Sequence, residues 1–174
     1  MFKLTLIALI ANIGFAQTSD DAWKKIDEVD NFRNSLAKTL KADQVITEDT
    51  FNTVCKPVGG KIKMISESTG WTFKQITHKN RNEKNGLDEN VKDYYDSFLK
   101  DPKKMRESYR TELGGIPGTR YLQRITVQEN CLFCHGQNEK RPQFIKDKYV
   151  NDKAYDFKAG DLRGVYSVFV PEKK

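Results

Sequence analysis

Five consecutive residues late in the chain form the pattern C-x-x-C-H, from Cys131 through Cys134 to His135. Two thiols at this spacing can add across the two vinyl groups of one haem, and the histidine that follows is then held under the iron as an axial ligand. The chain has three cysteines and two histidines, so one of its two histidines stands in the required place. The motif therefore predicts one covalent haem c, with thioether bonds to Cys131 and Cys134 and with His135 as the proximal ligand.

Two other interpretations of the cysteine pair are weaker. A structural zinc ion needs a fourth ligand from Cys55 or His78, and the adjacent Cys134 and His135 are awkward as two ligands of one tetrahedral ion. A thioredoxin-like dithiol opens a helix after a strand in a βαβ unit, and the sequence before Cys131 does not predict such a unit. We therefore prefer the covalent haem.

The second axial ligand of such a haem is an open question. If thioethers consume the cysteine pair, Cys55 is left over, and an odd cysteine count does not fit an ordinary disulfide framework. The candidates are Cys55, His78, Met64, Met105 or no residue at all. An isolated methionine is more often core filler, and His78 lies in a lysine-rich stretch typical of a solvated surface. A thiolate ligand would lower the reduction potential of the iron, whereas a methionine would raise it.

The start of the chain predicts export. Lys3 supplies a positive charge, residues 4–13 are mostly apolar, and residues 14–16 offer small side chains before a cleavage site after Ala16. The apolar run is short for a membrane span of about 20 residues, although an uncleaved N-terminal anchor is the alternative. We expect a signal peptide at 1–16 and a haem-binding domain at 17–174. The mature domain should have no membrane span and should be periplasmic or otherwise exported and soluble, which agrees with haem attachment outside the cytoplasm.

The composition and charge of the chain limit the classes of partner that it is expected to bind. Charged residues make up 31% of the chain, hydrophobic residues 37%, and the net charge is +6, which fits one domain with a polar surface and a modest core. Lysines alternate with acidic residues and form no basic stripe with aromatic residues, so nucleic acid is not an expected partner. The basic surface is either an ordinary solvated one or a means of steering towards an acidic redox partner.

Hydrophobic periodicity predicts helices early in the chain and strands late. We expect a first helix at 20–46 and a second helix that follows a cap at 47–49. Further helices are expected at 91–109, with an interruption at Asp101-Pro102, and at 142–150. We expect strands at 71–78, 119–127 and 163–170, and loops at 80–90 and 114–118. This order indicates an α+β fold with an antiparallel sheet.

With these segments in hand, the chain resembles the PAS-like single-haem c-type cytochromes. This family was long catalogued as a domain of unknown function and was first described structurally in a cyanobacterial member. The resemblance covers about residues 30–170. It depends on segments that occur in a fixed order: Phe51-Asn-Thr-Val-Cys55, Gly70-Trp-Thr-Phe73, Arg81-Asn82, Gly118-Thr-Arg-Tyr121, Glu129-Asn-Cys-Leu-Phe-Cys-His-Gly136 and Gly160-Asp-Leu-Arg-Gly164.

The resemblance implies a PAS-like antiparallel sheet with flanking helices and a haem against the sheet. It also implies His135 and Cys55 as the axial pair. The chain departs from the family where Pro57, Gly59 and Gly60 follow Cys55, because relatives tend to continue a helix there. It also lacks the usual proline after Arg81-Asn82.

Three functions fit a single haem of this kind. The first is a redox or gas-responsive sensor module, in which a weak distal thiolate yields to a diatomic ligand or on reduction, with a separate signalling protein as partner. The second is a soluble electron-transfer cytochrome with a redox partner. The third, a haem enzyme, lacks an evident acid–base pair. Arg81, Arg120 and Arg163 are candidates to meet the haem propionates, although each is as readily a surface residue.

Overall fold

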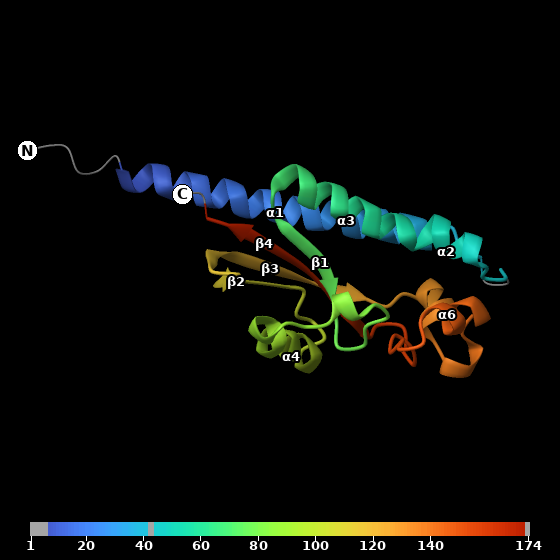
Figure 1. The fold of residues 1–174 in the computed structure, drawn as a ribbon. Helices are drawn as coiled ribbons and strands as arrows, with labels where there is room; N and C mark the ends of the chain where they lie inside the picture. Colours follow the sequence, from blue (N-terminus) through green and yellow to red (C-terminus); the bar gives the residue numbers. More distant parts are fainter. Residues whose placement is uncertain (1–6, 42–43, 173–174) are drawn as a thin grey trace, which may run out of the picture.

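A four-stranded antiparallel sheet with helices on both faces forms the protein (Figure 1). The computed structural model describes residues 7–41 and 44–172, and for residues 7–18 it describes the backbone alone. The helices are α1 (Ile7–Ala37), α2 (Glu48–Val54), α3 (Lys56–Thr69), α4 (Lys92–Lys100), α5 (Leu132–His135) and α6 (Gln143–Lys148). The strands are β1 (Thr72–Ile76), β2 (Arg106–Leu113), β3 (Ile116–Thr126) and β4 (Leu162–Pro171). Short 3₁₀ turns occur at η1 (Glu83–Asn85), η2 (Glu89–Val91), η3 (Glu129–Cys131) and η4 (Asn138–Lys140).

The last strand in the sequence occupies the middle of the sheet. The strand order is β1-β4-β3-β2, and Val168 of β4 lies between Phe73 of β1 and Tyr121 of β3. Every pairing is antiparallel. The α+β prediction is confirmed, and the central strand joins segments that are far apart in the chain.

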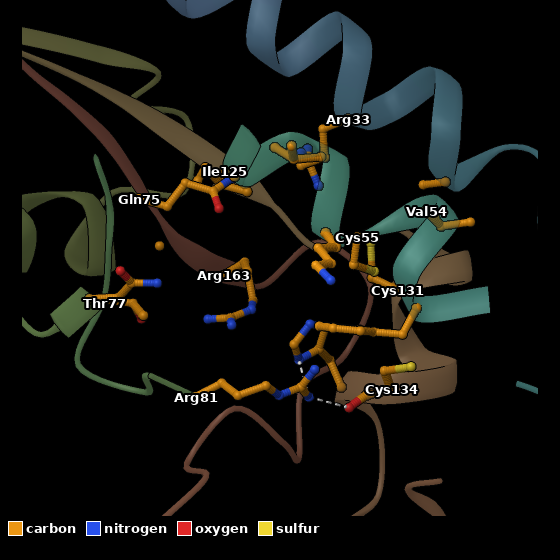
Figure 2. Close-up of a pocket in the computed structure, with 18 of the residues that line it drawn as sticks. Arg33, Val54, Cys55, Gln75, Thr77, Arg81, Ile125, Cys131, Cys134 and Arg163 are labelled. Atoms are coloured by element: carbon orange, nitrogen blue, oxygen red, sulfur yellow. Dashed lines mark hydrogen bonds between the residues drawn. The ribbon is translucent and has the colours of Figure 1, made fainter. Parts of the chain in front are cut away.

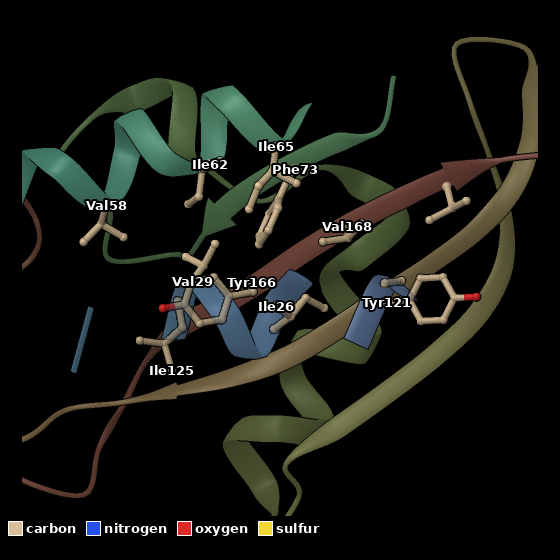
Figure 3. Packing of buried hydrophobic residues seen from close by; sticks show 12 residues of the cluster. Ile26, Val29, Val58, Ile62, Ile65, Phe73, Tyr121, Ile125, Tyr166 and Val168 are labelled. Carbon is tan, nitrogen blue, oxygen red and sulfur yellow. The ribbon is translucent and has the colours of Figure 1, made fainter. Parts of the chain in front are cut away.

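One face of the sheet is covered by α1 and α3, which lie side by side along it (Figure 1). Figure 3 shows Ile26 and Val29 of α1 and Ile62 of α3 pointing at Tyr166 and other sheet residues of one buried cluster. In α1 these apolar residues recur at helical spacing, as the sequence pattern predicts. Burial of this stripe fixes α1 and α3 against the sheet and so sets one wall of the site described below.

The other face of the sheet packs on α4. Tyr95 and Phe98 of this helix lie in a second buried cluster with Leu122 and Val165 of the sheet. Buried Arg124 crosses this layer, where its guanidinium donates to the carbonyls of Asp101 at 3.0 Å and Lys104 at 2.9 Å. It also donates to the buried carbonyl of Phe98 in the last turn of α4, where a helix leaves carbonyls without partners of its own.

The prediction of a helix at 20–46 is wrong at both ends. Helix α1 begins earlier, at Ile7, and it ends at Ala37. Its end is fixed from outside the helix, since the side chain of Asn130 donates to the carbonyl of Ala37 at 2.8 Å. Part of the predicted signal peptide, residues 1–6, lies outside the described residues. The predicted cleavage site after Ala16 falls within α1, and cleavage there stays a prediction. No helix in the described ranges is long and apolar enough to cross a membrane.

The prediction of a helix at 91–109 is wrong in its second half. Helix α4 stops at Lys100, before the expected interruption, and the chain then enters strand β2. This strand lies at the edge of the sheet and carries few apolar residues, so its alternation gave a weak signal. Gly114 and Gly115, both with positive φ, turn it directly into β3. The loop expected at 114–118 is therefore shorter, and β3 already begins at Ile116.

Replacing Gly118 tests the packing between β3 and β4. A Cβ atom at this position would lie 2.4 Å from the carbonyl oxygen of Val170. We expect Gly118→Ala to lower the free energy of unfolding by about 1–3 kcal/mol, because the strands must shift. Gly60→Ala is the control, since no atom lies within 4 Å of a Cβ there. It should raise stability by up to about 1 kcal/mol, because alanine is the better helix former. Urea denaturation followed by circular dichroism measures both, and equal effects would contradict the packing.

Candidate functional site

A cavity of about 430 Å³ lies between the sheet, the α2–α3 helices and the C-x-x-C-H segment. Its size falls within the range of about 300–1,000 Å³ that is usual for ligand pockets in proteins. Cys55, Cys131, Cys134 and His135 all line it, and Figure 2 shows the three cysteines at its border. The structure thus brings together in one cavity all four residues that the sequence and the family resemblance had singled out.

The cysteine pair is presented by two short helical turns. Cys131 ends turn η3, and Cys134 lies in α5, one turn further on. Helical spacing of three places both side chains on the same face of the segment. Burial raises the pKa of the Cys134 thiol to about 11, so this thiol is not a reactive thiolate near neutral pH. The raised pKa of Cys134 and the all-antiparallel sheet both disfavour the interpretation as a thioredoxin-like dithiol.

His135 is oriented by a backbone carbonyl. Its Nδ1 lies 2.7 Å from the carbonyl oxygen of Ala154, to which it donates a hydrogen bond. The lone pair of the imidazole is then on Nε2, which makes no hydrogen bond with any described residue. Burial lowers the pKa of His135 well below its usual value, and the charges of Arg163 and Arg81 lower it further. The side chain is therefore a neutral imidazole, the form that binds a metal ion.

Asp152 holds the segment that carries this carbonyl. One carboxylate oxygen accepts a hydrogen bond from the amide of Ala154 at 2.8 Å. The other pairs with Arg81 at 3.2 Å and Arg141 at 2.7 Å. Arg81 also donates to the carbonyl of Cys134 at 3.0 Å (Figure 2). A single buried carboxylate therefore connects the cysteine motif to the loop that orients its histidine.

Cys55 lies at the break between two helices. It is the C-cap of α2 and the N-cap of α3, and Pro57 stands in the first turn of α3. Proline is favoured there because the first turn needs no backbone N–H donor inside the helix. Gly59 and Gly60 lie within the helix that follows, so α3 runs on past them to Thr69. The departure from the family pattern noted above therefore does not end the helix after Cys55.

The environment of Cys55 acts on its thiol in two directions. Desolvation by the surrounding protein raises the pKa of Cys55, and the nearby Cys131 adds to this effect. Arg81, Arg163 and Arg33 oppose it, because their positive charges favour the thiolate. The thiol is exposed at the cavity wall, and no disulfide joins it to either of the other cysteines. It is therefore free to bind a group inside the cavity.

The other candidates for a second axial ligand lie elsewhere. His78 is 3.1 Å from the hydroxyl of Tyr95 and lines a separate cavity. Met64 on α3 and Met105 before β2 are 63% and 51% exposed and do not line the cavity of the cysteines. Of the residues that the sequence proposed for this role, Cys55 alone lines that cavity. Within the described ranges, no three His, Cys, Asp or Glu side chains form a metal-ion cluster, which gives the zinc interpretation no support.

The three arginines that the sequence offers as propionate partners do not all lie at the cavity. Arg81 and Arg163 line the cavity. Arg120 does not, because it forms a two-pronged ion pair with Asp88 at 2.7 and 3.0 Å near Tyr109. The sequence does not distinguish Arg120 from Arg81 and Arg163, because the pairing of Arg120 with Asp88 joins residues far apart in the chain.

Sequence reasoning missed Asp152 and Arg141, and it singled out Arg81 without its acidic partner. The contact between Asp152 and Arg81 spans 71 positions, and Asp152 lies in a polar stretch that resembles an ordinary surface. Its side chain is only 1% exposed. A single acidic residue in a charged segment carries no signal of burial, so only the folded chain identifies it.

Replacing Asp152 tests this network. We expect Asp152→Ala to lower the free energy of unfolding by about 3–5 kcal/mol, because two buried arginines lose their counter-charge and Ala154 loses a hydrogen-bond acceptor. Asp152→Asn can still accept the bond from Ala154, so it should be less damaging. Glu48→Gln, which removes an exposed ion pair with Lys148, is the control and should leave stability unchanged. Urea unfolding measures all three, and a neutral Asp152→Ala would refute the role of this carboxylate.

Comparisons with known proteins agree with the geometry. Residues 16–171 match the family described as Tll0287-like. Among solved structures, the chain is similar to the cyanobacterial heme-protein Tll0287, with 34% sequence identity and a TM-score of 0.81. The match covers 91% of this chain and 97% of that protein. No curated protein matches the chain.

Proposed function

Because this chain belongs to the Tll0287-like family, we propose that it is an exported monohaem protein of the c type that acts as a redox or gas-responsive sensor module. One observation carries the haem assignment: two thiols at C-x-x-C-H spacing and a neutral histidine with an uncommitted Nε2 line a single cavity. The similar cyanobacterial protein is itself a heme-protein, which supports the same cofactor here.

The residues that line the cavity would have different roles in binding a haem. Cys131 and Cys134 would form the thioether bonds, and His135 would bind the iron through Nε2 because Ala154 occupies Nδ1. Cys55 would be the second axial ligand. Apolar side chains from α1, the turn after it, α2 and α3 would pack on the ring and exclude water: Ala37, Leu40, Phe51, Val54 and Val58. When bound, the iron supplies one-electron exchange between its ferric and ferrous states.

The position of Cys55 favours a sensor role. The residue lies at the α2–α3 junction and not within a helix, so it can move with less loss of hydrogen bonds than a mid-helix residue. Release of Cys55 would act on α3, which packs against α1 through Val58 and Ile62. A change at the iron would thereby reach the outer helical layer.

Electron transfer is the second candidate. The net charge of +6 would steer the protein towards an acidic redox partner, and a covalent haem suits a carrier that must not lose its cofactor. A haem enzyme is less favoured, because the described residues that line the cavity include no Asp or Glu and no second histidine that could serve as an acid–base pair.

Covalent attachment is tested on the exported protein. We expect the purified chain to carry the mass of one haem and to keep it after denaturation, because thioether bonds survive unfolding. The double variant C131A/C134A should lose all covalent haem, whereas His78→Ala, on the separate cavity, should keep it. Mass spectrometry and the pyridine haemochrome spectrum measure this. A colourless wild-type protein would refute the proposed function.

The distal ligand is tested by its spectrum. We expect Cys55→Ala to change the ferric absorption and EPR spectra, because a thiolate is a strongly electron-donating ligand. Met64→Ala and Met105→Ala should leave both spectra as in the wild type, because both side chains point into solvent. If Cys55→Ala leaves the ferric spectrum unchanged, the distal assignment fails.

The same proteins separate the sensor from the carrier. A sensor should bind carbon monoxide readily in the reduced wild-type form, at a rate close to that of reduced Cys55→Ala. A carrier should keep six-coordinate iron in both oxidation states and bind carbon monoxide only after Cys55 is replaced.

A further inference from the structure

Arg163, at the start of β4, is a cation in the cavity wall without a counter-charge. Among the contacts of the described residues, its guanidinium donates one hydrogen bond, to the carbonyl of Lys79 at 3.2 Å. A guanidinium has five N–H donors, so most of its donors are unused. Within the described part of the chain, no Asp or Glu side chain forms an ion pair with it. Figure 2 shows the side chain extending into the hollow.

The other arginines of this cavity differ in that respect. Arg33 pairs with Asp30 at 3.0 Å, and Arg81 pairs with Asp152 at 3.2 Å. Burial and the charge of Arg81 lower the pKa of Arg163 to about 10, which is the direction expected for a cation that lacks a partner. Because an unpaired buried charge is costly, the position suits an anion that arrives from outside the polypeptide.

The walls of the cavity are divided by polarity. The helical side, from α1 to α3, is mostly apolar. Most of the polar groups lie on β1, the loop after it and the start of β4: Gln75, Thr77, Arg81, Asn82, Asn85 and Arg163. The helical side adds Arg33, which is paired with Asp30, and Lys56 at the start of α3. The side chain of Gln75 makes no hydrogen bond with any described residue. A ligand with an apolar body and an acidic edge would match this division.

The orientation of a c-type haem selects that polar side. The porphyrin carries its two vinyl-derived carbons on one half of the ring and its two propionates on the opposite half. In Figure 2, Cys131 and Cys134 lie at one end of the cavity, and Gln75 and Thr77 lie at the other with Arg163 between. Thioether bonds at the first end would therefore direct the propionates towards the second.

We infer that Arg163 binds a haem propionate, with the amide of Gln75 as a second donor. This inference rests on the proposed haem cofactor and adds the residues that fix the acidic edge of the ring. The pairing would be a charge-assisted hydrogen bond of guanidinium and carboxylate, which is favourable in both charge and shape. A positive charge there also favours the reduced iron, because reduction lowers the charge of the haem.

The experiment uses the exported holoprotein with Arg163→Gln, Arg163→Lys and Gln75→Ala. Arg110→Gln on β2 is the matched control, because it also removes one arginine charge but is 66% exposed and does not line the cavity. Haem content, the reduction potential and the propionate bending band in the resonance Raman spectrum are measured for each protein. A second arm adds excess acetate to wild type and to Arg163→Gln.

We expect Arg163→Gln to lower the reduction potential and to shift the propionate band, with one haem still attached. Arg163→Lys should keep the potential closer to that of the wild type and still shift the band, because lysine keeps the charge but loses the planar fork. Gln75→Ala should shift the band alone, and Arg110→Gln should change neither quantity. If Arg163→Gln does not fold, the lysine and Gln75 variants decide the question by the band.

Two results would overturn the inference. One is a wild-type propionate band in both Arg163 variants with unchanged haem content. The other is an acetate-induced spectral change in wild type that Arg163→Gln abolishes, since Arg163 would then bind a free anion instead of the propionate. Loss of haem from the wild-type protein itself is a different outcome, which refutes the cofactor and not this contact alone.

Discussion

The hydrogen bond from His135 to the carbonyl of Ala154 is the interaction on which the site depends. It fixes the tautomer of the imidazole and leaves the lone pair on Nε2, the nitrogen that would bind the haem iron proposed here. The carbonyl is in place only because Asp152 holds the amide of the same residue, and Asp152 can be buried only because Arg81 and Arg141 neutralise it. One buried carboxylate therefore links the ligand geometry to the folding of the chain.

The two sides of the cavity differ in stiffness. The His135 side is tied down by this network and by the adjacent sheet. The Cys55 side is a junction between two helices, where the backbone ladder is already interrupted. If His135 and Cys55 bind the haem iron as proposed, coordination could change on the Cys55 side without loss of the cofactor. The apolar contacts of α3 with α1 give such a change a path to the protein surface.

Charge is distributed unevenly in this cavity. Three arginines and Lys56 supply its cationic groups, and the acids that pair with two of the arginines, Asp30 and Asp152, stand outside the lining. The remaining arginine, Arg163, contacts the carbonyl of Lys79 and the ring of Phe157, and it has no acidic partner among the described residues. A positive cavity of this kind would counteract the lowering of the reduction potential by a thiolate ligand. Burial is the main cause of the lowered pKa of His135, and the charges of Arg163 and Arg81 lower it further.

Local patterns in the sequence predict which residues could carry the chemistry. The spacing of Cys131, Cys134 and His135 and the apolar stripe of α1 follow from local patterns, because helical periodicity places those side chains whatever the rest of the chain does. Strand β2 escaped detection, since an edge strand with polar side chains has little hydrophobic signal. Only the tertiary structure decided that Cys55 shares the cavity of the motif while His78, Met64 and Met105 do not. It alone also distinguished Arg163 from Arg120 and revealed Asp152. Each of these facts depends on contacts between distant segments that sheet pairing and core burial bring together, and no local pattern encodes them.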